Sequence, residues 1–148
     1  MSSEKSLPFE STIYVRDHCL CLHVQRAARA LARRFDDALR PYGLTNGQFS
    51  LLMSLNRPEP PPMGPVAALL AMDRTTLTAA LIPLERRGLV RSSPDPKDRR
   101  SRILILTDQG KELLASALPV WKSTHEELEK AAPDINFEKL RKDLKAVS

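Results

Sequence analysis

The sequence contains few aromatic residues, few glycines and only two cysteines. Aromatic residues make up 5% of the 148 positions, so the hydrophobic core must consist mainly of leucine and alanine, which favour helices. The cysteines, Cys19 and Cys21, cannot form a disulfide framework, and together with three histidines they show no zinc-binding spacing. We therefore expect a mainly helical protein that binds neither a metal nor a cofactor.

Long hydrophobic runs are also missing. No segment reaches the roughly 20 apolar residues that cross a bilayer, and residues 1–10 have no hydrophobic signal core. No nucleophile elbow, phosphate loop or pair of cleft carboxylates is recognisable. The chain length and the 42% content of hydrophobic residues suit one domain. The sequence therefore predicts a single-domain, cytoplasmic protein that is not an enzyme and does not contact a membrane.

Positive charge is concentrated in one segment. The net charge is +5, and the segment from Asp73 to Arg102 contains eight basic and four acidic residues, an excess of +4. A concentration of basic side chains is what binding to nucleic-acid phosphates requires. On charge alone, however, a solvated charged face is the simpler interpretation.

Apolar residues at intervals of three and four predict that most of the chain is helical. Asp17 and Thr107 can each cap a long helix, Thr45 and Gln48 form a capping-box pattern, and Gly88 is placed to end a helix in the left-handed conformation. Four prolines within residues 57–62 exclude a helix there. We expect a loose arm over residues 1–12, then helices over about 17–39, from 45, and over 65–71, 74–87, 107–130 and 134–147.

Two short β-prone runs follow Gly88. The runs 89–92 and 101–106 flank a polar, basic loop at 94–100, so we expect a β-hairpin with a long basic tip. A short helix, a tight turn at 72–73 and a second helix precede the hairpin. This order describes a helix-turn-helix followed by a wing.

Four stretches of the sequence resemble the MarR family of bacterial transcriptional regulators. They correspond to the entry of the family's second helix, the start and the end of its recognition helix, and its wing. In order, they are Tyr42–Phe49, Asp73–Thr78, Leu84–Val90, and Asp95–Arg100 followed by Leu106 and Thr107. The resemblance extends over about residues 17–145 without a large gap, and the wing motif is its most specific part.

The resemblance implies a fold, a partner and an assembly. Members of the family are mainly helical winged helix-turn-helix proteins that bind double-stranded DNA as homodimers. By similarity, residues 1–148 form one MarR-like domain, in which 17–41 and 107–148 supply dimerisation helices and 45–106 form the DNA-binding lobe. The recognition helix is expected in the major groove and the wing tip in the minor groove. The usual role in the family is that of a repressor.

The recognition helix supplies the first set of candidate DNA contacts. Leu77, Leu81 and Leu84 form the apolar stripe of this helix and are expected to face the core, which leaves the polar residues of the first two turns on the other side. Threonine hydroxyls can bond phosphates or base edges, and arginine can pair with guanine. The candidates are Arg74, Thr75, Thr76 and Thr78. Alternatively, Thr75 and Thr76 only help to start the helix.

The wing supplies the second set. Arg100 is the strongest single candidate, because an arginine in a mobile basic loop can enter a narrow minor groove. Asp98 either pairs with the Arg100 guanidinium or braces the loop. Lys97, Arg99 and Arg102 are expected to attract phosphates without reading sequence. The alternative is a solvated turn with weak surface ion pairs.

Cys21 suggests an alternative to control by a ligand. Cys19 and Cys21 follow Asp17 near the expected helix start, where the helix dipole lowers the pKa of a thiol. By resemblance, Cys21 occupies the position of the reactive cysteine in the family's peroxide-sensing branch. However, Phe35 and Asn46 stand where that branch has tyrosines, and a buried, inert Cys21 is the favoured interpretation.

Three functions are compatible with the sequence. The first, which we favour, is a homodimeric repressor that leaves a pseudo-palindromic operator when a small effector binds, such as a phenolic or other aromatic acid. The second is a thiol-based redox sensor that uses Cys21. The third is a winged-helix module that binds another protein, and the basic recognition segment argues against it.

Overall fold

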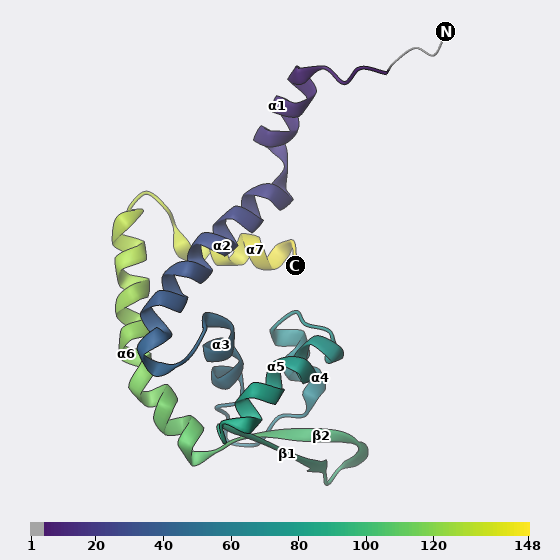
Figure 1. Ribbon diagram of the computed structural model, residues 1–148, viewed down its shortest axis with the longest axis vertical. Helices are drawn as coiled ribbons and strands as arrows, with labels where there is room; N and C mark the ends of the chain where they lie inside the picture. The colour runs from purple at the N-terminus through teal and green to yellow at the C-terminus, as the bar shows by residue number, and fades with distance from the viewer. Residues whose placement is uncertain (1–4) are drawn as a thin grey trace. The chain divides into compact units, whose positions relative to one another are not determined.

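The structure is a computed structural model that describes residues 5–148. The chain divides into two compact units, Met1–Arg34 and Phe35–Ser148. In the first unit, α1 (Phe9–His18) is followed by the N-terminal part of α2 (Leu20–Leu39), and α2 continues into the second unit (Figure 1).

The N-terminal segment is helical earlier than expected. Instead of a loose arm over residues 1–12, α1 begins at Phe9, directly after Pro8. Pro8 has extended backbone geometry and, like other prolines, suits the position before or at the start of a helix. The first part of the expected arm, residues 1–4, lies outside the described residues.

The expected single helix from Asp17 to Leu39 is interrupted at Cys19, where the backbone is extended (φ −68°, ψ 107°). The predicted cap, Asp17, therefore lies inside α1, where its carboxylate pairs with Arg16 Nε at 2.9 Å. Cys19 takes the capping position of α2, because its Sγ accepts a hydrogen bond from the N–H of Leu22 at 3.4 Å. The prediction of an uninterrupted helix was wrong for this reason.

The second unit contains a helix-turn-helix, a wing and two C-terminal helices. The end of α2 passes through a 3-10 turn, η1 (Arg40–Tyr42), to Gly43, whose positive φ of 66° reverses the chain. The remaining helices are α3 (Asn46–Ser54), α4 (Met63–Leu69), α5 (Arg74–Arg86), α6 (Asp108–Ala131) and α7 (Phe137–Ala146), and the strands are β1 (Val90–Asp95) and β2 (Asp98–Leu106). The bounds of α4 to α7 agree with those expected from the sequence to within three residues.

Side-chain caps begin α3, α5 and α6, and the sequence predicts those of α3 and α6. Thr45 and Gln48 form a complete capping box at the start of α3, with two hydrogen bonds of 3.1 Å. Asp73 caps α5 and Thr107 caps α6, each by accepting a backbone N–H. Gly88 adopts a φ of 73°, so the chain turns in the left-handed conformation after α5.

Leucines from α3, α5, the wing and α6 form one hydrophobic core. The predicted stripe of α5, Leu77, Leu81 and Leu84, is buried throughout. On α3, Met53 is 36% exposed whereas Leu51 is buried. Since α3 packs against both α4 and α6, its buried face is wider than a single stripe and lies on the side of Leu51.

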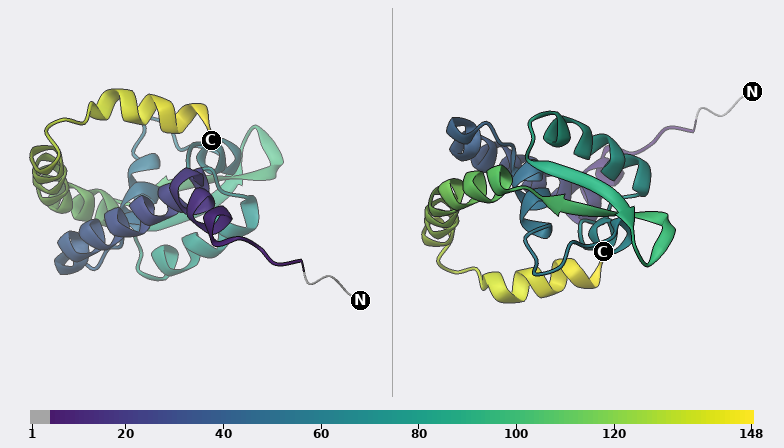
Figure 2. Two further views of the ribbon diagram at one scale, coloured as in Figure 1. Left: turned by 90° about the horizontal axis from the view of Figure 1, so that it is seen from above. Right: turned by 90° about the horizontal axis from the view of Figure 1, so that it is seen from below.

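The wing has longer strands and a tighter tip than expected. Strands β1 and β2 are antiparallel and pair as far as Asp95 and Asp98, so the expected loop at 94–100 is reduced to the two residues between them. Two side chains close this tip, because Asp95 Oδ1 accepts the N–H of Lys97 at 2.9 Å and Asp98 Oδ1 accepts the N–H of Arg100 at 3.0 Å. The right view of Figure 2 shows the two strands side by side.

The other edge of β2 pairs with the proline-rich segment before α4. The N–H of Leu104 donates to the Pro61 carbonyl at 2.9 Å, and Pro62 forms an isolated antiparallel bridge with Ile103. The segment that excludes a helix therefore holds the base of the wing against the helix-turn-helix.

Within residues 5–148, no single helix is long and apolar enough to cross a membrane. Only α4 and α5 taken together, with a bend of 100° between them, reach that length and composition.

Candidate nucleic-acid interface

Helix α5 presents a polar face to solvent because its apolar residues are used in the core. Leu77 and Leu84 are fully buried, which turns the opposite side of the first turns outward. The four residues expected to contact DNA on this helix are all exposed: Arg74, Thr75, Thr76 and Thr78. The Thr78 hydroxyl donates to the Arg74 carbonyl at 2.8 Å, so it offers its lone pairs rather than its proton to a partner.

Asp73 fixes the start of this polar face. Its Oδ1 accepts the N–H of Thr76 at 2.7 Å, and this hydrogen bond is the main reason why the pKa of Asp73 lies below its ordinary value. The ionised carboxylate also interacts favourably with the positive end of the helix dipole. The cap therefore keeps the first turn of α5, which carries Arg74 and Thr75, in helical geometry.

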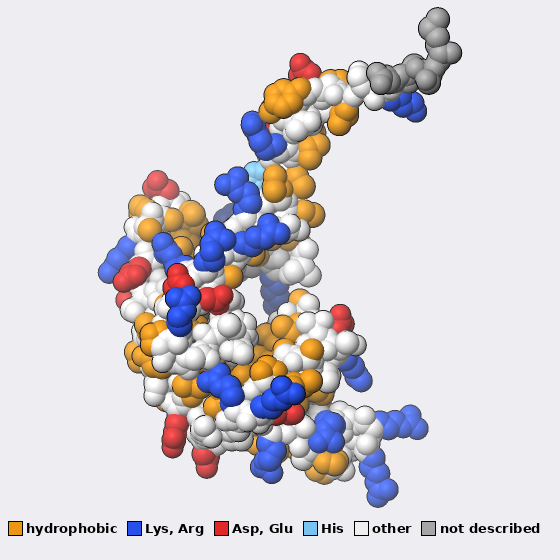
Figure 3. All heavy atoms as spheres, viewed as in Figure 1, with side chains coloured by type: hydrophobic (Ala, Val, Ile, Leu, Met, Phe, Trp, Pro, Cys, Tyr) orange, Lys and Arg blue, Asp and Glu red, His pale blue; other side chains and the backbone are white. Residues whose placement is uncertain are grey.

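Basic side chains project from the end of the wing (Figure 3). Lys97, Arg99 and Arg100 are exposed. Arg100 lies in β2 and not in a mobile loop as expected, because the closed tip brings its backbone into the strand. In the strand register Pro94 pairs with Arg102 and Asp95 pairs with Asp98, so Arg99 and Arg100 lie in a bulge of β2 and have no pairing partner on β1.

Asp98 supports the wing through the backbone. Its carboxylate accepts the N–H of Arg100, and within residues 5–148 it forms no ion pair with the Arg100 guanidinium. Arg102, expected to attract phosphates, also holds the two strands together, because its Nε and Nη2 donate to Ser92 Oγ at 3.2 and 3.0 Å. The sequence analysis did not identify Ser92, because its contact with Arg102 depends on how the two strands pair. The loop expected at 94–100 was too long to predict that pairing.

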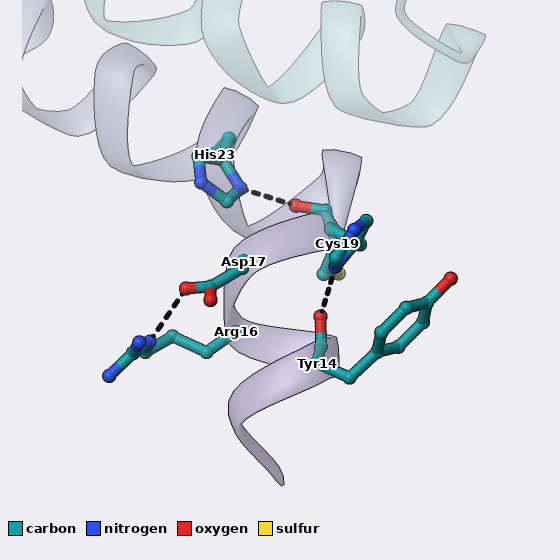
Figure 4. Close-up of polar contacts among 6 residues, drawn as sticks. Tyr14, Arg16, Asp17, Cys19 and His23 are labelled. Atoms are coloured by element: carbon teal, nitrogen blue, oxygen red, sulfur yellow. Dashed lines mark hydrogen bonds and ion pairs between the residues drawn. The ribbon is translucent and has the colours of Figure 1, made fainter. Parts of the chain in front are cut away.

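Cys21 is exposed in the single chain, so the expectation of a buried cysteine was wrong. Cys19 is half-buried at the break between α1 and α2. Figure 4 shows its surroundings: the His23 ring lies against the Cys19 carbonyl, with 2.7 Å between Nδ1 and O, and the Arg16–Asp17 pair lies in the preceding turn.

The residues that stand in place of the tyrosines of the peroxide-sensing branch pack within the second unit. The buried Phe35 ring has its centroid 6.2 Å from that of Trp121 and 6.0 Å from that of His125. Asn46 donates its backbone N–H and its side-chain amide to Asp36 Oδ1 at 2.7 and 2.8 Å. Both residues therefore stabilise the junction of α2 with α3 and α6.

Comparison with known proteins places these features in a family. The MarR family profile matches residues 44–101, which include the helix-turn-helix and most of the wing. The M. tuberculosis transcriptional regulator MosR, in a crystal structure with DNA, is 36% identical to this chain, with a TM-score of 0.79 and an alignment that covers 88% of this chain and 93% of MosR. The chain belongs to the MarR family.

Two further relatives agree with this assignment. The transcriptional repressor CouR, bound to a 23-mer DNA duplex, is 31% identical, with a TM-score of 0.78 and coverage of 90% of this chain and 94% of CouR. The HTH-type transcriptional regulator BilQ of Clostridioides difficile (strain CD3) is 26% identical over 143 residues, which are 97% of this chain and 91% of BilQ.

This MarR-family protein is therefore a DNA-binding transcriptional regulator. Its relatives are regulators and not enzymes. The resemblance and the fold class expected from the sequence, mainly helical with a small β wing, are confirmed. The assignment as a DNA-binding regulator replaces the alternative of a winged-helix module that binds another protein.

Proposed function

We propose that this MarR-family protein is a homodimeric repressor that acts in the cytoplasm and leaves a pseudo-palindromic operator when a small aromatic acid binds. The observation that carries the proposal is the exposed polar face of α5 beside a basic wing. One recognition helix and one wing from each protomer would contact one half-site of the operator. Two recognition helices would then lie about 34 Å apart, one turn of DNA. We assign DNA contacts to Arg74, Thr75, Thr76, Thr78, Lys97, Arg99 and Arg100, with Asp98 as the support of the wing.

Exposed apolar side chains on α7 favour the dimer. Leu140, Leu144 and Val147 lie on one stripe of its sequence and are 39%, 43% and 65% exposed. A stripe of this kind is normally covered by another surface, and we propose a second copy of the chain. In this proposal residues 1–148 form one domain, with dimerisation helices at 17–41 and 107–148 and the DNA-binding lobe at 45–106.

A groove between α6 and α7 has the chemistry that an aromatic acid needs. Its volume of about 480 Å³ lies within the range of roughly 300–1,000 Å³ found for small-molecule sites. It is lined by Trp121, Lys122, His125, Glu126, Glu129 and Arg141. The ring of the acid would lie against Trp121, and its carboxylate would pair with Lys122 or Arg141.

Operator binding tests the proposal directly. The purified protein is footprinted on the DNA upstream of its own gene, and the protected fragment is used in gel shifts at increasing salt. We expect one palindromic protected site, affinity that falls as salt rises, and loss of binding when one half-site is scrambled. Sedimentation as a monomer, or full affinity for a single half-site, would contradict the dimeric repressor.

Fluorescence tests the effector. Trp121 is the only tryptophan, so an aromatic acid such as salicylate should change its emission at the concentrations that release the operator. Arg141→Gln should weaken both effects, whereas Lys139→Gln, a control on α7 outside the residues that line the groove, should weaken neither. A change in emission without release of DNA would exclude this groove as the effector site.

The exposure of Cys21 favours redox control as a second candidate function. If Cys21 is the sensor, an organic peroxide should release the wild-type protein from its operator. Cys21→Ser should still bind DNA but no longer respond, while Cys19→Ser should respond as the wild type does. Peroxide-induced release of Cys21→Ser would rule out this candidate.

A further inference from the structure

Arg87 joins the end of the recognition helix to the end of α2. It is the C-cap of α5, and its Nη1 donates to the Gly43 carbonyl at 2.6 Å, although 44 positions separate the two residues. Gly43 ends the turn that follows α2, with its backbone in the left-handed conformation. A Cβ at this position would lie 3.1 Å from Arg87 Nη2, so glycine allows the guanidinium to lie close against the backbone.

The chemistry of this contact suits a positioning role. The oxygen of a backbone carbonyl carries partial negative charge, which attracts a cation. The planar guanidinium donates in fixed directions, and hydrogen bonds from a charged donor are stronger than neutral ones. The neighbouring Arg86 is also exposed, but within residues 5–148 its side chain forms no hydrogen bond or ion pair. Two adjacent arginines therefore carry the same charge and make different contacts.

The two residues after Arg87 connect the same turn to α6. The Gly88 carbonyl accepts the hydroxyl of Thr107 at 2.7 Å, and the Leu89 carbonyl accepts the N–H of Thr107 at 3.1 Å. Residues 87–89 thus tie α5 to both elements of the second unit that we assign to dimerisation, the end of α2 and the start of α6.

We infer that Arg87 is a positioning residue that sets the angle of α5 against α2, and so the distance between the two recognition helices of the dimer. The inference rests on the dimeric function proposed above. With Arg87 in place, α5 is held at its C-terminal end from two sides, and an operator whose half-sites are moved apart or together fits less well. Without this bond the C-terminal end of α5 loses its hydrogen bond to the turn after α2, so the helix adapts to several spacings.

Operators with different distances between their half-sites distinguish a positioning role of Arg87 from attraction of its charge to DNA. Affinities are measured for the natural operator and for versions with one base pair added or removed between the half-sites. Arg87→Met should lose about tenfold on the natural operator and much less on the altered ones, so that the ratio of affinities approaches one. Arg86→Met, which removes the same charge, should lower the affinity for all operators by the same factor. Arg87→Lys should keep the salt dependence of the wild type without its spacing preference.

Other outcomes overturn the inference. If Arg87→Met loses the same factor on every operator and its salt dependence falls by about one phosphate contact, Arg87 only binds DNA. If the proposed dimeric function is wrong, the wild-type protein itself is a monomer or shows no spacing preference. That result would contradict both the dimeric function and the role of Arg87. Circular dichroism and thermal unfolding establish that each variant is folded. If Arg87→Met does not fold, the spacing preference of Arg87→Lys provides the test.

Discussion

At the scale of single residues, hydrogen bonds to Asp36 make the second unit sensitive to acid. Its carboxylate accepts the backbone N–H and then the side-chain amide of Asn46, and these bonds outweigh burial and hold the pKa of Asp36 below its ordinary value of 3.8. Because the pKa is lower in the folded chain, the ionised form stabilises the fold. This stabilisation is fully present above the unfolded-state pKa and is lost as the pH falls through the folded-state pKa.

Asp36→Asn should therefore lower the free energy of unfolding at pH 7 by about 1 kcal/mol, since a neutral amide accepts the two hydrogen bonds less strongly. The difference from the wild type should shrink below pH 3.8, where the wild-type carboxyl becomes protonated. Urea unfolding at both pH values measures the effect. Asp37→Asn is the control, because within residues 5–148 the Asp37 carboxylate pairs only with exposed Arg40, and its loss should change stability little. A difference that stays constant with pH would contradict the role of the Asp36 charge.

Arg99 and Arg100 allow a second test with single residues. If Arg100 enters the minor groove, Arg100→Ala should weaken operator binding by about 1–3 kcal/mol and reduce discrimination between A·T and G·C pairs under the wing. Arg99 is expected to attract phosphates without reading sequence, so Arg99→Ala should weaken binding to all sequences alike. Gel shifts on operators with altered flanking pairs measure both, and unchanged affinity of Arg100→Ala would exclude the groove contact.

At the scale of elements, the start of α6 is pressed against the base of the wing at Gly110. A Cβ at this position would collide with the Leu89 carbonyl and would lie 2.7 Å from Leu106 Cδ1. Gly110→Ala should therefore destabilise the fold by about 1–3 kcal/mol, because β1 and β2 would have to move away from α6. Chemical unfolding measures the loss.

Gly47→Ala is the matched control for this prediction. Gly47 also lies in the first turn of a helix, α3, but a Cβ there meets only Thr45 Oγ1 at 4.0 Å. Alanine is favoured over glycine inside a helix by roughly 0.5–1 kcal/mol, so this variant should be as stable as the wild type or more stable. Equal losses for the two variants would contradict the steric argument.

Signals that lie close together in the sequence predicted the elements well. The Thr45–Gln48 pattern, the threonine before α6 and the glycine after α5 each act within one turn, and the structure confirms all three. Spacing of Leu77, Leu81 and Leu84 was enough to predict which side of α5 is buried. The exposure of the proposed recognition residues follows from that face, so this part of the candidate site was predictable.

The sequence did not predict contacts that choose between two local conformations, such as a continuous or a broken helix, or a long or a short loop. At Cys19 a weak sulfur acceptor replaces the expected cap, and at the wing tip Asp95 and Asp98 shorten a loop that composition alone makes look long. The Arg87–Gly43 bond depends on how distant segments meet in the folded chain, and no pattern within one segment signals it.

At the scale of the whole molecule, the proposed dimer depends on the apolar stripe of α7. Leu144→Asp would place a charge in the interface, which is costly when the charge is unpaired, so we expect a monomer that no longer binds the operator. Lys142→Asp changes the charge of the same helix away from the stripe and should leave a dimer. Analytical ultracentrifugation and gel shifts measure assembly and binding. A dimeric Leu144→Asp that retains operator affinity would place the interface elsewhere.

The proline segment that pairs with β2 also limits how far the sheet can grow. The Pro61 carbonyl faces β2, so the next residue, Pro62, faces outward, and because it has no N–H it cannot supply a donor that an additional strand would need. Hydrogen bonding in the sheet therefore stops at the prolines. Even in concentrated solution, this edge resists the strand-by-strand stacking that turns soluble domains into fibrils.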